Sequence, residues 1–216
     1  MSKKRYAPRI PRTANGFRAQ DLRALPRGAW WTKSWLKGIE EMRIGARAGR
    51  GKVYAEQGQV SSLSVSGTHV EAAVLGARPD PYTVKLDFVS LESFRGCSLA
   101  DICERIGDMS VGRILAGEMP TSIDEFFALE GVPLCPTLGR DHLWCSCPDW
   151  SKPCKHIAAV LYLLGDVMLR DPSLLLRLRG IDISDGAPSQ EQSLPIWKGS
   201  ERFNDFTDRV FRRVSR

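Results

Sequence analysis

The chain has 216 residues, of which 43% are hydrophobic and 26% are charged, a composition typical of a globular protein with one large domain or two small ones. The longest apolar segment, near residues 156 to 169, is too short to span a bilayer, and the charged, proline-interrupted start differs from a secretory signal. We therefore expect a cytoplasmic protein, which could be associated with the nucleoid, with no membrane partner. Because that compartment is reducing, its cysteines should be free, catalytic or metal-bound.

The formal net charge of +6 is concentrated at the N-terminus, where residues 1 to 27 carry eight basic residues and a single acid, Asp21. A basic arm on a nearly neutral body attracts phosphate backbones by releasing their counterions. The alternative is a solvated tail that only keeps the protein soluble. We predict nucleic-acid contacts from five residues of this arm: Lys3, Lys4, Arg5, Arg9 and Arg12.

Residues 28 to 42 predict a short amphipathic helix. Four apolar residues recur at helical spacing and share one face: Trp31, Trp35, Ile39 and Met42. We expect this face to lie in the core. The alternative is that the tryptophans at positions 30, 31 and 35 stack on nucleic-acid bases.

The next segment, RAGRGKVYAEQGQV, is rich in glycine and predicts a turn or loop. Its basic residues Arg47, Arg50 and Lys52 are candidates for phosphate contacts, although the segment lacks a Walker pattern. Residues 58 to 89 then alternate between apolar and polar positions in three runs separated by SGTH and GARPDP. This pattern predicts a three-stranded antiparallel meander with these apolar positions: Val60, Leu63, Val65, Val70, Ala72, Val74, Tyr82, Val84, Leu86 and Phe88.

From about residue 98 the periodicity becomes helical and predicts three short helices, the last with Ser122 and Glu125 as a capping box. Cys97 and Cys103 are expected to be small buried hydrophobic residues of this region. A further helix should follow the cysteine-rich stretch, and another should run from Asp171 to about Arg179. The tail predicts a C-terminal amphipathic helix with an apolar face of Phe203, Phe206 and Val210.

The sequence therefore predicts an α+β fold with a small antiparallel β meander, several short helices and a zinc finger followed by a buried helix. We divide the chain into a basic arm (1–27), an amphipathic helix with the β-meander region (28–95) and a helical region with the finger (96–180, finger 140–165). A linker and the C-terminal amphipathic helix follow (181–216).

The strongest chemical signal is the segment CSCPDWSKPCKH, which supplies Cys145, Cys147, Cys154 and His156. Two short chelating pairs, Cys-x-Cys and Cys-x-His, offer the four ligands that zinc prefers in a tetrahedron. The two prolines and the aspartate between them favour tight turns, which let the pairs face each other. We predict one structural zinc ion bound by these four residues.

Three alternatives compete with a zinc site formed by these four residues. A disulfide needs an oxidising compartment, and a Cys-x-Cys pair would close a strained ring. A thioredoxin-like redox site needs Cys-x-x-Cys, which is absent. Cys135 and His142 lie just upstream and remain candidates to replace one ligand, because the entropy cost of a longer loop grows slowly. His69 is expected in a strand, without a functional role.

The metal is expected to be chemically inert. Catalytic zinc keeps a coordination position open, whereas three thiolates and an imidazole fill the tetrahedron. The sequence shows no nucleophile with its base and no phosphate loop, so we predict that the protein is not an enzyme. The helix after the finger is apolar on nearly every side, so it is not expected to read bases. Basic residues near the finger are candidates for phosphate contacts: Lys152, Lys155, Arg170, Arg177 and Arg179.

The motif CSC…CKH followed directly by an apolar helix resembles the SWIM zinc finger, a Cys-x-Cys…Cys-x-His module of bacterial, archaeal and eukaryotic proteins. The stretches WWTKSW, RGKVYAEQGQV, GARPDPYTVKL and LLLRLRG resemble landmarks of the stand-alone bacterial SWIM zinc finger family, which extends the resemblance to residues 28 to 180. The resemblance implies binding to DNA or to other proteins, and a role as an accessory of Swi/Snf-type helicase ATPases.

Three functional hypotheses follow. The first is a non-enzymatic, zinc-stabilised adaptor that brings a helicase ATPase or another DNA-processing complex to nucleic acid. The second is a protein that binds DNA or RNA directly, without an ATPase. The third is an architectural subunit of a larger ribonucleoprotein assembly.

Overall fold

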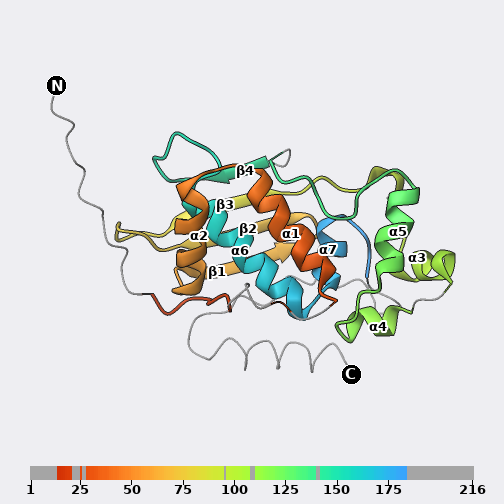
Figure 1. The fold of residues 1–216 in the computed structure, drawn as a ribbon. Helices are drawn as coiled ribbons and strands as arrows, with labels where there is room; N and C mark the ends of the chain where they lie inside the picture. The colour runs from red at the N-terminus through yellow and green to blue at the C-terminus, as the bar shows by residue number, and fades with distance from the viewer. Residues whose placement is uncertain are drawn as a thin grey trace.

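The structure of the protein is a computed structural model that describes residues 14–20, 25, 28–94, 96–107, 110–139 and 142–183 (Figure 1). The candidate contact residues of the basic arm and the predicted C-terminal helix lie outside these ranges. Within them, the predicted α+β class is confirmed, because one four-stranded antiparallel sheet is accompanied by seven α-helices.

The predicted meander is formed by β1 (Val60–Ser66), β2 (His69–Val74) and β3 (Tyr82–Asp87), which pair antiparallel in sequence order. A fourth strand, β4 (His142–Cys145), pairs antiparallel with β3 and was not predicted. The strand order is therefore β1-β2-β3-β4. Because β4 ends at the first cysteine of the finger motif, the sheet positions one side of the predicted metal site.

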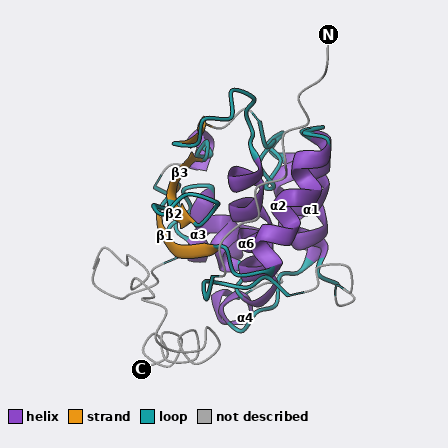
Figure 2. Ribbon diagram, turned by 90° about the vertical axis from the view of Figure 1, so that its left-hand side faces the viewer, coloured by secondary structure: helices purple, strands orange, loops and turns teal. Residues whose placement is uncertain are grey.

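The sheet buries one face and exposes the other. Alternate residues of β2 and β3 are buried: Val70, Ala72, Val74, Val84 and Leu86. The residues between them, such as Glu71 and Lys85, are exposed. Helices α1, α2 and α6 lie together on one side of the sheet (Figure 2). The fold is therefore a helical layer on a sheet whose other face carries polar side chains.

Helix α6 (Lys155–Arg170) is the central helix of that layer, and it packs against α1, α2, β3 and β4. Eleven of its sixteen residues are buried, as its apolar sequence predicted. None of the helices in the described part of the chain is long and apolar enough to cross a membrane.

Helix α1 (Trp30–Glu41) confirms the predicted amphipathic helix. The indole N–H of Trp31 donates to the Met168 carbonyl, and that of Trp35 donates to the Leu161 carbonyl, each over 2.8 Å. Trp35 is fully buried and Trp31 is 6% exposed. These two rings therefore anchor α1 to α6, and neither is available to stack on a base.

Helix α2 (Ala46–Glu56) replaces the predicted loop, so that prediction was wrong. Its buried residues Gly51, Tyr54 and Ala55 have the spacing of one helical face, and the helix packs along α6. A Cβ atom on Gly51 would lie 2.4 Å from the Cβ of Ala158. Glycine lowers intrinsic helix propensity but allows this close approach, so tertiary packing outweighs local preference.

Three short helices follow β3 as predicted: α3 (Leu99–Ile106), α4 (Val111–Leu115) and α5 (Thr121–Leu129). The predicted capping box of Ser122 with Glu125 is wrong, because Pro120 holds the N-cap position of α5 and Ser122 lies inside the helix. A capping box occurs instead at α3, where Ser98 and Asp101 accept hydrogen bonds from each other's backbone N–H groups. A 3₁₀ turn, η1 (Glu92–Phe94), precedes α3, and α7 (Ser173–Leu178) follows α6.

Candidate metal centre

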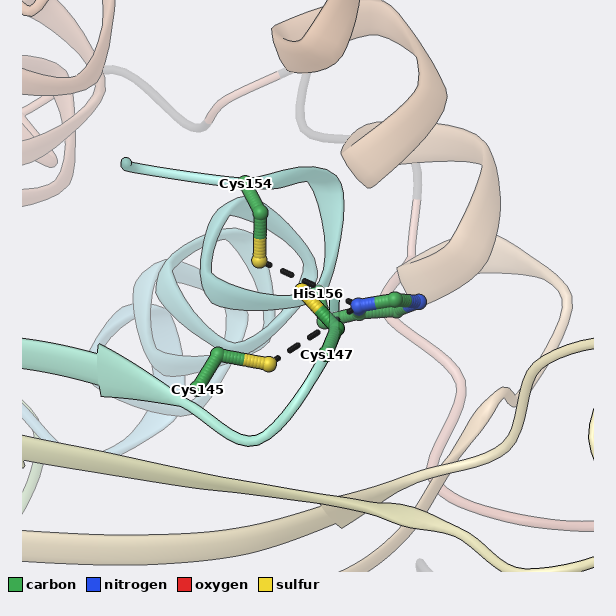
Figure 3. Close-up of side chains that lie close together, drawn as sticks. All are labelled: Cys145, Cys147, Cys154 and His156. Carbon is green, nitrogen blue, oxygen red and sulfur yellow. Dashed lines mark hydrogen bonds between the residues drawn. The ribbon is translucent and has the colours of Figure 1, made fainter. Parts of the chain in front are cut away.

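Three thiols and one imidazole converge where β4 meets α6. Cys145 ends β4, Cys147 lies in the turn that follows, Cys154 is the N-cap residue of α6, and His156 lies in its first turn. One ligand atom from each of the four lies within 4.8 Å of all the others (Figure 3). Among the described residues, these four form the cluster of Cys, His, Asp or Glu side chains whose potential ligand atoms all lie within that distance of one another.

The chain folds back here because its turn is held from both sides. The backbone N–H of Thr83 on β3 donates to the Ser146 hydroxyl, and the N–H of Ser146 donates to the Thr83 carbonyl, each over 3.0 Å. Within the turn, Asp149 accepts the backbone N–H of Ser151 over 3.1 Å. An aspartate that binds the backbone two residues later stabilises a tight turn. These bonds bring the Cys-x-His pair opposite the Cys-x-Cys pair.

The spacing of the ligand atoms fits zinc. Bonds of about 2.3 Å to sulfur and 2.0 Å to nitrogen, at tetrahedral angles, place a sulfur and a nitrogen about 3.6 Å apart. In the structure, Cys145 Sγ and Cys154 Sγ each lie 3.8 Å from Nδ1 of His156 (Figure 3). All four residues are buried, and none is more than 8% exposed. The centre is therefore consistent with one structural zinc ion, as predicted, and with no open coordination position.

The electrostatics of the three thiols favour a cation. A hydrogen bond with Cys145 lowers the pKa of Cys154 to about 3, and the same bond raises the pKa of Cys145. Burial raises the pKa of Cys147. Burial disfavours the charged form of a thiol, so ionisation of all three in this site requires compensating positive charge. A divalent metal ion supplies that charge and displaces the protons.

Two tyrosines hold the His156 ring. The phenol ring of Tyr82 on β3 stacks on the imidazole with a centroid distance of 4.4 Å, and Tyr54 on α2 contacts it at 5.7 Å in an edge arrangement. A Cβ atom on Gly76 would lie 2.7 Å from Cε2 of Tyr82, so glycine leaves room for this stack. The second ring nitrogen, Nε2, is buried without a hydrogen-bond partner among the described residues, which leaves Nδ1 as the nitrogen that faces the thiols.

The geometry of this site accords with the comparison to known families. Residues 137–165 match the SWIM zinc finger family. The SWIM finger thus covers β4, the cysteine-rich turn and the first part of α6.

A second comparison covers more of the chain. The chain is 35% identical over 182 residues to "Uncharacterized protein Rv2102" of Mycobacterium tuberculosis. The alignment covers 82% of this chain and 65% of the relative, so the chain spans just under two thirds of that protein's length. No solved structure gave a significant match.

The SWIM finger is docked on helix α2 by polar contacts. Arg47 forms an ion pair with Asp149 of the finger turn, with 3.3 Å between Nε and Oδ2. The ammonium group of Lys155 donates to the Tyr54 hydroxyl over 2.6 Å and lies 4.5 Å from the centre of that ring. Sequence reasoning did not assign Tyr54 or Tyr82 to the metal site, because their neighbours in the chain carry no metal-site pattern.

The basic candidates near the finger differ in their contacts. Lys152 donates to the Cys145 carbonyl over 2.9 Å and lies 3.8 Å from Cys147 Sγ, so its charge also faces the thiols. Lys152 and Arg50 are exposed, whereas Lys52 is half-buried. Arg50 makes a 3.4 Å hydrogen bond to the Ala46 carbonyl of its own helix. Arg50 and Lys52 therefore lie on α2, and Lys152 lies on the finger turn.

Three arginines after the finger are bound within the fold. Arg170 pairs with Asp166, and Arg177 pairs with Asp171. Arg179 is 7% exposed and donates to the Val89 carbonyl. Two of these pairs are local to α6 and α7, and the Arg179 contact joins the end of α7 to the segment after β3.

The alternative ligands lie outside the thiol cluster. Cys135 is half-buried and its burial raises the pKa of its thiol to about 12, while His142 is exposed at the start of β4. Cys103 is buried in α3, as predicted, and Cys97 is half-buried just before that helix. His69 lies in β2, as predicted, and contacts Asp87.

Proposed function

We propose that this chain is a non-enzymatic adaptor whose structural zinc holds a finger turn that binds nucleic acid. The observation that carries the proposal is Trp150, which is 91% exposed on the finger turn. Its neighbour Asp149 pairs with Arg47 of α2, so the exposed ring stands next to a residue that is fixed to the body of the fold. Sequence reasoning did not select this tryptophan, because nothing local shows that its ring faces solvent.

The chemistry around Trp150 suits a polyanion with accessible bases. A base that stacks on an exposed aromatic ring contributes about 1–3 kcal/mol, largely independent of sequence. Lys152 on the finger turn, and Arg50 and Lys52 on the helix that packs along α6, are the described basic residues that we propose contact phosphates. The basic arm would add further phosphate contacts. Nucleic acid with unpaired bases is therefore the favoured ligand.

The metal supports binding and not catalysis. Three sulfurs and one nitrogen would fill the four positions of a tetrahedral zinc ion, which would leave no position for a substrate or an attacking water. The binding free energy of such an ion is largely folding free energy. The function proposed for the finger is to hold the turn that carries Trp150.

The protein partner in this proposal is a Swi/Snf-type helicase ATPase, or a similar DNA-processing enzyme, in the cytoplasm or at the nucleoid. The resemblance to stand-alone SWIM proteins supports this partner. Purification of the protein with its native partners tests it: recovery of an ATPase supports the adaptor role. Recovery of ribosomal or other structural RNA without an ATPase would favour an architectural subunit instead.

Fluorescence anisotropy with labelled single-stranded and duplex oligonucleotides, measured across salt concentrations, tests direct binding. We expect Trp150→Ala to weaken single-strand binding by about 5- to 150-fold, the equivalent of one lost stack. Trp144→Ala is the matched control, because Trp144 is 50% exposed on β4 and lies outside the finger turn. Deletion of residues 2 to 12 should leave the fold intact and reduce the salt dependence of oligonucleotide binding. No detectable binding at low salt would refute direct recognition.

A further inference from the structure

The exposed face of the sheet carries a row of potential ligands that is separate from the thiol cluster. In the register of the strands, His69 on β2 lies opposite Asp87 on β3, and Asp87 lies opposite His142 on β4. Residues directly opposite each other in an antiparallel pair point to the same face of the sheet. The three side chains therefore stand side by side across three adjacent strands.

Both histidines outside the finger lie next to Asp87 in this row. The chain contains three histidines, and one of them belongs to the SWIM finger. The other two both flank Asp87 in this row. The side chains of His69 and Asp87 are 42% and 53% exposed, and His142 is also exposed, so an ion can reach all three from solvent.

We propose that His69, Asp87 and His142 form a second metal site, for a divalent transition metal ion such as Ni²⁺, Co²⁺ or Zn²⁺. Two imidazoles and a carboxylate are a mixed nitrogen and oxygen set that binds these ions and differs from the sulfur-rich finger. Adjacent strands are about 4.8 Å apart, which places the two histidines about 10 Å apart on either side of the carboxylate. Both imidazoles can lean inward to an ion above Asp87.

Half of this site is already assembled. Nδ1 of His69 lies 2.5 Å from Oδ1 of Asp87. The His142 ring makes no hydrogen bond to any described residue and does not yet converge with the other two, so it must rotate toward Asp87 on binding. The ion then takes the place of the proton between His69 and Asp87.

The next cross-strand pair on the same face, Glu71 with Lys85, is compatible with a cation at Asp87. Lys85, two residues before Asp87 on the same face, forms an ion pair with Glu71 over 3.9 Å. The carboxylate of Glu71 offsets the positive charge that would otherwise repel a cation at Asp87. With three protein ligands on a solvent-exposed face, the remaining coordination positions take water or a donor from another molecule.

Titration of the full, untagged, zinc-loaded chain with Ni²⁺ by calorimetry tests the site. We expect one further equivalent to bind, and we expect His69→Ala and His142→Ala each to weaken that binding by more than about tenfold. Ser66→Ala is the matched control, because Ser66 pairs with His69 in the same row and supplies no imidazole. Unchanged circular dichroism and unchanged zinc content in each variant exclude a folding defect.

Two measurements separate this site from the finger. Ni²⁺ should broaden the amide NMR signals of His69, Asp87 and His142 before those of Cys154. Absorption in the near ultraviolet should show no thiolate-to-nickel band until the finger zinc is displaced. The proposal is overturned if no equivalent binds beyond the finger zinc, or if both histidine variants bind Ni²⁺ as tightly as the unaltered chain.

Discussion

The imidazole of His156 lies against the phenol ring of Tyr82, with centroids 4.4 Å apart and planes inclined by 26°. This stack joins a candidate zinc ligand on α6 to the middle of the antiparallel meander, on β3. The metal centre and the sheet should therefore fold as one cooperative unit, because the orientation of the ligand depends on a strand more than seventy residues away in the chain.

Removal of this stack should weaken zinc binding. We expect Tyr82→Ala to lower the zinc affinity by about 10- to 100-fold, the usual effect of losing a residue that orients a metal ligand. Tyr82→Phe keeps the ring and should remain close to the unaltered protein. Competition with a chromogenic chelator measures both affinities. Equal affinities for the alanine variant and the unaltered chain would show that the stack does not position His156.

Loss of one candidate ligand should remove the metal and unfold the finger. Cys154 is fully buried at the start of α6, and its thiol contacts His156. Cys154→Ser should abolish stoichiometric zinc and lower the melting temperature, because the energy of metal binding is largely folding energy. Cys135→Ser is the control, since Cys135 lies outside the cluster, and it should retain zinc. Elemental analysis and thermal melts decide between these outcomes.

Acid should release the zinc. The pKa of Cys154 in the fold is lowered to about 3 by its hydrogen bond with Cys145, whereas an unfolded cysteine has a pKa of about 8.5. A lowered pKa keeps the Cys154 thiolate available to the metal at lower pH than an unfolded cysteine would be. Because protons compete with zinc for the thiolates and the imidazole, we expect zinc content and melting temperature to fall together as the pH falls.

Added zinc tests the coupling between protonation and metal loss. Because protons and metal compete for the same thiolates, excess free zinc should move the midpoint of release to lower pH. A midpoint that stays constant as the zinc concentration rises would indicate that acid unfolds another part of the protein first. Dialysis at each pH followed by elemental analysis supplies the measurement.

The elements that sequence reasoning predicted are those with local signals. The helix through Trp31 and Trp35 and the three strands of the meander have clear periodicity, and the structure contains them. The finger motif has a short spacing that zinc chemistry dictates, and its four residues converge. In each case the residues that form the sequence pattern lie close together in the chain, and the same residues make the contacts that define the element.

The elements that were missed depend on distant partners. Helix α2 contains Gly49 and Gly51, which weaken the local helical signal, and its stability comes from packing along α6. Strand β4 has four residues and exists because β3 offers it an edge. The capping box was assigned to Ser122 because the sequence pattern alone does not show that Pro120 begins the helix.

The contact between α2 and α6 gives a matched pair of glycine substitutions. A Cβ atom on Gly51 would meet the Cβ of Ala158 at 2.4 Å, whereas one on Gly49 would meet nothing within 4 Å. Gly51→Ala should destabilise the fold by about 1–3 kcal/mol through overpacking, and Gly49→Ala should stabilise it by about 0.5–1 kcal/mol through higher helix propensity. Urea denaturation of both variants measures the difference. If Gly51→Ala were as stable as Gly49→Ala, the close approach that seats the SWIM finger on α2 would not exist in solution.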